Sequence, residues 1–173
     1  MPVGKKVCLR IYEDTILLLR LNKMTERVIT TDLSAARDLI REIIREVEAA
    51  GYDKDDCFAI RLATEEALIN AIKHGNKFDR SRKIRVSTDI DSQRVEITIA
   101  DEGEGFDPAS VPDPTADENL EKPCGRGIML MRAYMDEVIY NDKGNEVRMI
   151  RNRFSGLPKI RKTSANILER KDD

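Results

Sequence analysis

The chain has 173 residues, which fits one domain of ordinary size with short extensions and not two. Its 30 Lys and Arg nearly balance its 32 Asp and Glu, and aromatic residues make up 5%, which argues against a basic nucleic-acid binder and against a stacking platform for single strands. No apolar run approaches the ~20 residues that cross a bilayer, and the first residues lack the apolar stretch of a signal peptide. We therefore expect a cytoplasmic protein that contacts neither nucleic acid nor membrane directly.

Residues 1–27 carry two apolar segments. In the first, apolar residues alternate, which is typical of a strand because successive strand side chains point to opposite faces. The second is apolar on both faces and is compatible with a strand or a helix. We interpret the two together as a β-hairpin, formed by Val7, Leu9, Ile11 and Ile16–Leu21.

A short β-branched strand is predicted at 28–31, and the most regular amphipathic helix of the chain follows it. Asp32 or Ser34 can cap the start of this helix, and Gly51 supplies the stop. Apolar residues recur every three or four positions along it, at Ala36, Leu39, Ile40, Ile43, Ile44 and Val47.

A second helix is predicted to begin near Asp55 or Asp56 and to run to His74, where Gly75 ends it. We assign its apolar stripe to four residues, which are Phe58, Leu62, Ile69 and Ile72. The polar side chains Glu65, Glu66 and Asn70 lie in the middle of this stripe.

Two hairpins, a long loop and a third helix complete the prediction. The loop is rich in Pro, Asp and Gly, and loops of that length are usually functional lids or disorder. Helices combined with mostly antiparallel strands predict an α+β fold, a two-layer α/β sandwich with one sheet face covered and one free. The elements are the hairpin Ile84–Ile90 and Val95–Ile99, the loop 103–127, the helix Ile128–Met135, and the hairpin Val138–Tyr140 and Val147–Ile150.

Three groups of residues can carry chemistry, and Glu66 with Asn70 is the first. Side chains four residues apart share one face of a helix. A carboxylate and an amide so placed can hold a divalent cation such as Mg²⁺, which favours few protein oxygens and substrate phosphates. An isolated pair of this kind is more often part of a solvated helix face.

The second group is Asp101 with Gly103 and Gly105. The alternation that places Ile97 and Ile99 on the covered sheet face places Asp101 there too. A buried carboxylate must be hydrogen-bonded or serve a ligand, and it can accept from an exocyclic amino group such as that of adenine. The two glycines would let a ligand approach the backbone, although a plain turn after a strand has the same composition.

The third group is Gly125-Arg126-Gly127, directly before the third helix. Free N–H groups at a helix N-terminus bind anions, and glycines let phosphate oxygens reach them. Arg126 could contact a terminal phosphate. A flexible hinge is the alternative for this short motif.

Together, the three groups resemble the N, G1 and G2 boxes of the Bergerat ATP-binding fold, which histidine kinases, gyrase, Hsp90 and mismatch-repair ATPases share. The boxes read EALINAIKHG (66–75), DEGEGF (101–106) and GRGIMLM (125–131). The overall resemblance is to bacterial anti-sigma factor serine/threonine kinases and covers about residues 28–152. It implies an ATPase domain with a mostly antiparallel mixed sheet over 28–152, an extension over 1–27 and a tail over 153–173.

The resemblance also implies residue roles. Asn70 would ligate Mg²⁺, Glu66 would act as general base on a Ser or Thr hydroxyl, and Asp101 would recognise adenine. The glycines Gly103 and Gly105 would admit the nucleotide, and residues 107–124 would form a lid. Phosphate would be bound by Gly125, Arg126 and Gly127.

The implied function is that of an ATP- and Mg²⁺-dependent protein serine/threonine kinase. Such a protein binds a sigma factor and phosphorylates an anti-sigma-factor antagonist. A sensor histidine kinase is disfavoured, because the one histidine, His74, lies inside the ATP motif. Whether the N-terminal hairpin extends the edge of the sheet or builds a homodimer is left open.

Two departures from the family pattern leave a non-catalytic, ATP-gated binding module as the alternative. Asn145 stands where the family often has Thr, and Pro123-Cys124 stands where a lid arginine is often found. Arg126 or Lys122 would then have to neutralise the γ-phosphate.

Overall fold

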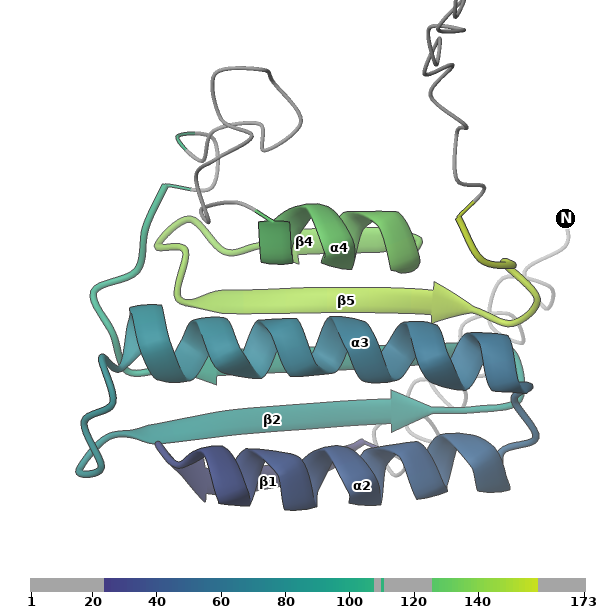
Figure 1. Ribbon diagram of the computed structural model, residues 1–173, viewed down its shortest axis with the longest axis horizontal. Coiled ribbons are helices and arrows are strands. Elements are labelled where there is room, and N and C mark those ends of the chain that lie inside the picture. The colour runs from purple at the N-terminus through teal and green to yellow at the C-terminus, as the bar shows by residue number, and fades with distance from the viewer. Residues whose placement is uncertain (1–23, 108–109, 111–125, 159–173) are drawn as a thin grey trace, which may run out of the picture.

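The computed structural model describes residues 24–107, 110 and 126–158. Within them, a five-stranded sheet forms one layer and helices form the other (Figure 1). The strands lie in the order β1 (Thr25–Thr30), β2 (Lys83–Ile90), β3 (Arg94–Asp101), β5 (Glu146–Asn152), β4 (Glu137–Tyr140). The helices are α2 (Leu33–Ala49), α3 (Lys54–Asn70), its π-helical continuation η1 (Ala71–Gly75), and α4 (Arg126–Tyr134).

The predicted α+β two-layer sandwich is confirmed. All four strand pairs in the described part of the chain are antiparallel, so the mixed sheet that the resemblance implied contains no parallel pair there. The N-terminal hairpin, most of the lid and the tail from residue 159 onward are predictions that lie outside the described residues. None of the described helices combines the length and apolarity that a membrane crossing needs.

The first helix begins and ends as its sequence predicts. Of the two candidate caps, Asp32 is the one used, because its Oδ1 accepts hydrogen bonds from the backbone N–H groups of Ser34 (2.8 Å) and Ala35 (3.3 Å). Gly51 follows the last turn with a φ of +87°, a conformation that favours glycine. All six predicted apolar positions are buried.

The second helix begins at Lys54, next to the predicted start, and Asp53 caps it. Its predicted apolar stripe is confirmed only in part, because Ile72 is fully buried whereas Phe58 is 49% exposed. The other two predicted positions, Leu62 and Ile69, are partly buried. The helix lies over the middle of the sheet between α2 and α4, so small side chains fill much of its buried face (Figure 1). Phe58 instead packs edge-on against Tyr134 of α4, with ring centroids 5.8 Å apart. The buried apolar residues of α3 are Cys57, Ala59, Ile60, Ala63, Ala67 and Leu68.

The hairpin of β2 and β3 fixes which face each residue occupies. Asp101 stands directly opposite the buried Ile84, and directly opposed residues in an antiparallel pair share a face. The prediction that Asp101 points toward the helices is therefore confirmed. The third helix begins at Arg126, two residues before the predicted start.

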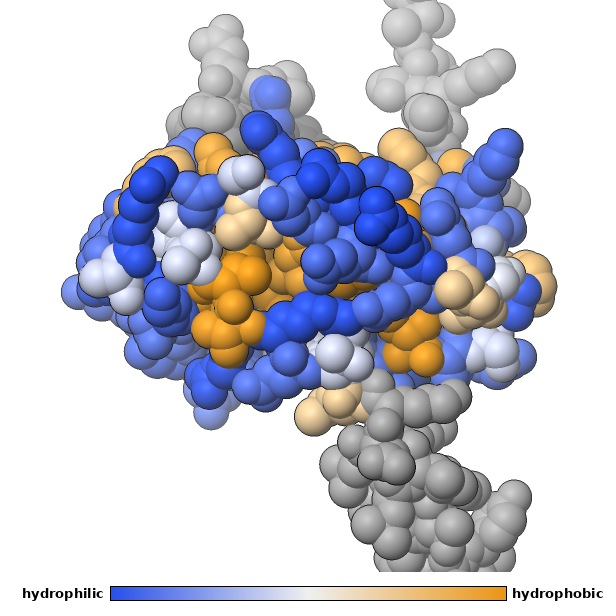
Figure 2. Space-filling model, turned by 90° about the horizontal axis from the view of Figure 1, so that it is seen from below, coloured by the Kyte–Doolittle hydropathy of each residue, from blue (hydrophilic) through white to orange (hydrophobic). Residues whose placement is uncertain are grey.

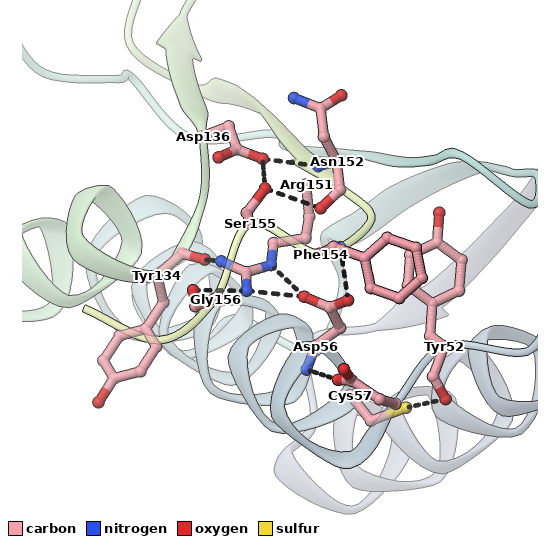
Figure 3. Close-up of polar contacts among 11 residues, drawn as sticks. Tyr52, Asp56, Cys57, Tyr134, Asp136, Arg151, Asn152, Phe154, Ser155 and Gly156 are labelled. Carbon is pink, nitrogen blue, oxygen red and sulfur yellow. Dashed lines mark hydrogen bonds and ion pairs between the residues drawn. The ribbon is translucent and has the colours of Figure 1, made fainter. Parts of the chain in front are cut away.

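A buried ion pair joins the start of α3 in the helix layer to the end of β5 in the sheet (Figure 3). Nε and Nη2 of Arg151 donate to Asp56 Oδ1 over 2.9 and 2.7 Å, and the two side chains are 3% and 1% exposed. Arg151 also donates to the carbonyl oxygens of Tyr134 (2.6 Å) and Gly156 (2.8 Å), while Asp56 Oδ2 accepts from the Phe154 N–H (3.1 Å). The pair thus holds α3, α4, β5 and the segment after β5 together.

Candidate functional site

The three predicted groups converge at one end of the molecule. The last turn of α3 carries Glu66 and Asn70, and α4 starts beside that turn and runs back in the opposite direction (Figure 1). The end of β3 carries Asp101, and it lies beneath the continuation of α3 into η1. Segments that are 25 to 60 residues apart in sequence therefore meet in one region.

Glu66, Asn70 and Gly127 share a small space between α3 and α4. A Cβ atom on Gly127 would lie 2.7 Å from Glu66 Oε2 and 3.5 Å from Asn70 Nδ2. A side chain at position 127 would therefore press on both polar groups. Glycine keeps this space open at the N-terminus of α4, and the positive end of a helix dipole favours an anion.

The carboxyl group of Glu66 has a raised pKa. Burial is the main cause, because it penalises the charged form, and the like charge of Glu65 adds to the effect. A carboxylate with a raised pKa is a stronger base than an exposed one. The raised pKa therefore makes Glu66 better suited to act as a general base than a fully exposed glutamate.

Asp101 is half-buried, and its Oδ1 accepts a hydrogen bond from the Gly103 N–H (2.7 Å). Burial raises the pKa of its carboxyl group, while the Gly103 N–H and the cations of Lys143 and Arg82 act in the opposite direction. The Gly103 bond occupies one lone pair of the carboxylate. Among the described residues this bond uses Oδ1 alone, which leaves Oδ2 to accept from a ligand.

Glycines pack directly around this carboxylate. A Cβ atom on Gly75 would overlap the carboxyl group of Asp101, and one on Gly103 would lie 2.6 Å from Asp101 Oδ1 and would overlap the Gly75 carbonyl. The sequence explains Gly75 only as the end of a helix. The structure adds that it makes room for the Asp101 side chain.

The backbone of the loop after β3 lies directly against the backbone of the turn between β4 and β5. Gly105 and Gly144 both have positive φ, +81° and +72°. A Cβ on Gly105 would overlap the Lys143 carbonyl, and a Cβ on Gly144 would overlap the Phe106 carbonyl. Only glycine allows both the conformation and the approach at these two positions.

Asn145 occupies the position where the resemblance leads us to expect threonine. Its Nδ2 donates to the Asp101 carbonyl oxygen (2.9 Å), and its Oδ1 accepts from Asn141 Nδ2 (3.0 Å). The backbone N–H of Asp101 donates to the Asn145 carbonyl (2.9 Å). The amide therefore braces the strand end that carries Asp101.

Sequence reasoning missed Asn76, which is fully buried. Its Nδ2 donates to Thr31 Oγ1 (2.9 Å) and to the Lys83 carbonyl (3.0 Å), and its Oδ1 accepts from the Glu102 N–H (3.0 Å). These bonds join the end of η1 to the residue after Asp101. The sequence offers only the adjacency of Asn76 to Gly75 as a signal.

The motif that the sequence predicts to bind phosphate, Gly125-Arg126-Gly127, is described in part. Arg126 is exposed and is the first residue of α4, and Gly127 faces Glu66. Gly125 lies outside the described residues, as do Lys122, Pro123 and Cys124. The assignment of Gly125 to phosphate binding stays a prediction.

Comparison with known proteins defines the class. Residues 29–151 match the model of the histidine kinase-like ATPase domain, and this chain belongs to that family. It is 36% identical over 109 residues to the "Serine-protein kinase RsbW" of Bacillus licheniformis, 32% identical over 108 residues to that of Bacillus subtilis (strain 168), and 34% identical over 110 residues to that of Staphylococcus epidermidis.

These alignments cover part of each protein. They span 57% of this chain and 66% of each Bacillus relative, and 59% of this chain and 69% of the Staphylococcus relative. A crystal structure of the RsbU and RsbW domains of a Mycobacterium tuberculosis protein aligns with 75% of this chain and 32% of its own, at a TM-score of 0.48 and 16% identity.

Proposed function

We propose that this protein is an ATP-dependent protein serine/threonine kinase that acts as an anti-sigma regulatory factor. The carrying observation is the convergence of Glu66, Asn70 and Gly127 in one space at the N-terminus of α4. The family membership and the similarity to kinases named RsbW support the same conclusion. The catalytic unit is proposed to be residues 28–152, within a cytoplasmic protein.

We assign the chemistry as follows. Glu66 takes the proton from a Ser or Thr hydroxyl of a partner protein as that oxygen attacks the γ-phosphorus of ATP, and the bond from the γ-phosphorus to the β,γ-bridging oxygen breaks to release ADP. The raised pKa of Glu66 supports this assignment. Asp101 accepts from the amino group of adenine, and the first turn of α4 with Arg126 and Gly127 holds phosphate oxygens.

Magnesium fits the residues present. Glu66 Oε2 and the side-chain amide of Asn70 lie beside the same space that Gly127 keeps open, and the amide group also carries an oxygen that can bind a cation. Mg²⁺ is bound in proteins by few side-chain oxygens together with substrate phosphates and water. We propose Asn70 as its ligand; when bound, the ion neutralises charge on the transferred phosphate.

The proposed partners are a sigma factor, which the protein would bind, and an anti-sigma-factor antagonist, which it would phosphorylate. The relatives named serine-protein kinase support a hydroxyl acceptor on a protein. Neither partner is identified by the residues of this chain.

The test is phosphoryl transfer to a candidate antagonist from the native organism, with γ-labelled ATP and Mg²⁺. The proposal expects a labelled serine or threonine, and loss of the label with Glu66→Gln while nucleotide still binds. If nucleotide changes partner affinity and no phosphate moves, the non-catalytic binding module is correct. Undiminished transfer by Glu66→Gln would remove Glu66 from the mechanism.

A further inference from the structure

The edge of the sandwich formed by β1 and α2 is poorly covered within the described residues. No residue of β1 is fully buried, although the strand belongs to a five-stranded sheet. Met24 and Val28 are 52% and 57% exposed, and Leu33 is 43% exposed. Figure 2 looks onto this edge and shows apolar surface between hydrophilic side chains. Exposed apolar surface of this kind marks a contact that another segment or chain makes.

Polar groups bridge this edge without closing it. Arg27 lies on the helix-facing side of β1, opposite Val86, and pairs with Glu46 of α2, with Glu42 3.9 Å away. Ile29 on the same side packs against the core but is only partly buried. In the described sheet, β1 is an edge strand, so one row of its backbone N–H and C=O groups lacks a neighbouring strand.

We propose that residues 15–21 close this edge as a further strand antiparallel to β1. The segment directly precedes Met24 and β1 in the chain, and it contains Ile16, Leu17, Leu18, Leu19 and Leu21. Two residues, Asn22 and Lys23, remain for the turn, which is the commonest length for a hairpin connection.

That turn fixes a register in which each side of the segment meets an exposed surface. On the free face of the sheet, Leu21 stands opposite Met24 and Leu17 stands opposite Val28, and both Met24 and Val28 are exposed apolar residues at this edge. On the helix-facing side, Leu18 stands opposite Arg27 and Ile16 opposite Ile29, so both lie over the open edge of the core. This pairing explains why the segment is apolar on both faces. A slip of one residue would exchange the faces.

We favour this chain's own segment over a second copy because the segment is connected to β1 by a short turn and matches it in length. A strand joined to β1 by a two-residue turn needs no large loop to close, and the segment 16–21, which is apolar except for Arg20, has six residues, as β1 does. A second copy of the chain or a helix over the same residues would not obey this register.

Disulfide trapping tests the register in the full chain. Cys8→Ser and Cys124→Ser remove two cysteines, while the buried Cys57 is kept. Leu17→Cys with Val28→Cys places two thiols at directly opposed positions, within the reach of a disulfide. Leu18→Cys with Val28→Cys is the matched control, because its thiols lie on opposite faces. We expect at least tenfold more intramolecular disulfide in the first pair.

Other results would overturn the proposal. Equal trapping in both pairs would mean a helix or no fixed structure over 15–21. Disulfide-linked dimers of Val28→Cys alone would mean that a second copy covers β1.

Hydrogen exchange in the full chain with its natural cysteines is an independent test. Leu18→Asp should speed amide exchange in β1 at least tenfold, and the control Lys6→Asp should not. Unchanged exchange in Leu18→Asp would contradict the strand. Neither readout depends on nucleotide, so failure of the kinase proposal would leave this one standing.

Discussion

Gly127 at the start of α4 faces Glu66 of α3 so closely that a Cβ atom on it would lie 2.7 Å from Glu66 Oε2. Real Cβ contacts are essentially never that short, so a side chain here must displace the carboxylate. The relationship joins the proposed phosphate-binding end of α4 to the proposed base on α3. We therefore expect the function of the site to depend on the distance between Gly127 and Glu66.

Gly127→Ala is expected to reduce phosphoryl transfer at least tenfold and to weaken Mg-ATP binding, because the new methyl group occupies the space shared by Glu66 and Asn70. Calorimetry with Mg-ATP and a transfer assay measure the two effects. Ala133→Ser, on the exposed side of the same helix, is the control and should change neither. Full activity in Gly127→Ala would show that phosphate does not enter this space.

The pH dependence of transfer should report the raised pKa of Glu66. A general base must be ionised, so the rate should rise with pH through a midpoint above the ordinary value of 4.5. Glu65→Gln removes the neighbouring like charge, so it should move this midpoint to lower pH. A rate profile that is unchanged by Glu65→Gln would mean that another group controls the rise.

The raised pKa of Glu66 should lower the stability of the folded chain over the same pH range in which it raises the rate. A carboxyl group whose pKa is raised by folding binds its proton more tightly in the folded state. Its contribution is present below the ordinary pKa and is lost as pH rises through the folded pKa. We therefore expect Glu66→Gln to gain stability relative to the natural chain as pH rises above the ordinary glutamate pKa of 4.5, which urea unfolding at a series of pH values will measure.

Asp101→Ala is expected to weaken ATP binding by about tenfold or more, because a hydrogen bond to a charged group contributes about 1.5–3 kcal/mol. The measurement is calorimetry with Mg-ATP. Asp89→Ala, on the opposite face of the same hairpin, is the control. Equal affinities of the two variants would mean that Asp101 does not contact the base.

Breaking the buried pair should cost stability without acting on the site directly. Asp56→Ala leaves Arg151 buried without its carboxylate, and such a loss costs about 3–5 kcal/mol in the free energy of unfolding. Asp38→Ala removes the partner of Arg41 in an exposed pair and should cost less than about 1 kcal/mol. Urea unfolding compares the two. A loss of similar size in both variants would contradict a stabilising role for the buried pair.

Local patterns in the sequence were enough to predict much of the fold. Alternation along β3 placed Asp101 on the covered face, and the spacing of apolar residues in α2 identified its buried side. Both patterns are set within one element, where the neighbours of a side chain follow from the backbone period.

What could not be predicted depends on other elements. Phe58 appeared to belong to the apolar stripe of α3, but α4 offers it Tyr134, and alanines fill much of the sheet-facing side. The bonds of Asn76 to Thr31 and of Asp56 to Arg151 join residues 45 and 95 positions apart. Only the folded arrangement of the layers reveals such partners.

Calorimetry of the full chain with Mg-ATP tests the central claim most directly, because the claim is that three segments form one pocket for that nucleotide. The account predicts saturable binding by the natural chain, and at least tenfold weaker binding by Asn70→Ala or after removal of Mg²⁺. No heat at millimolar Mg-ATP, or equal affinity in Asn70→Ala, would contradict it.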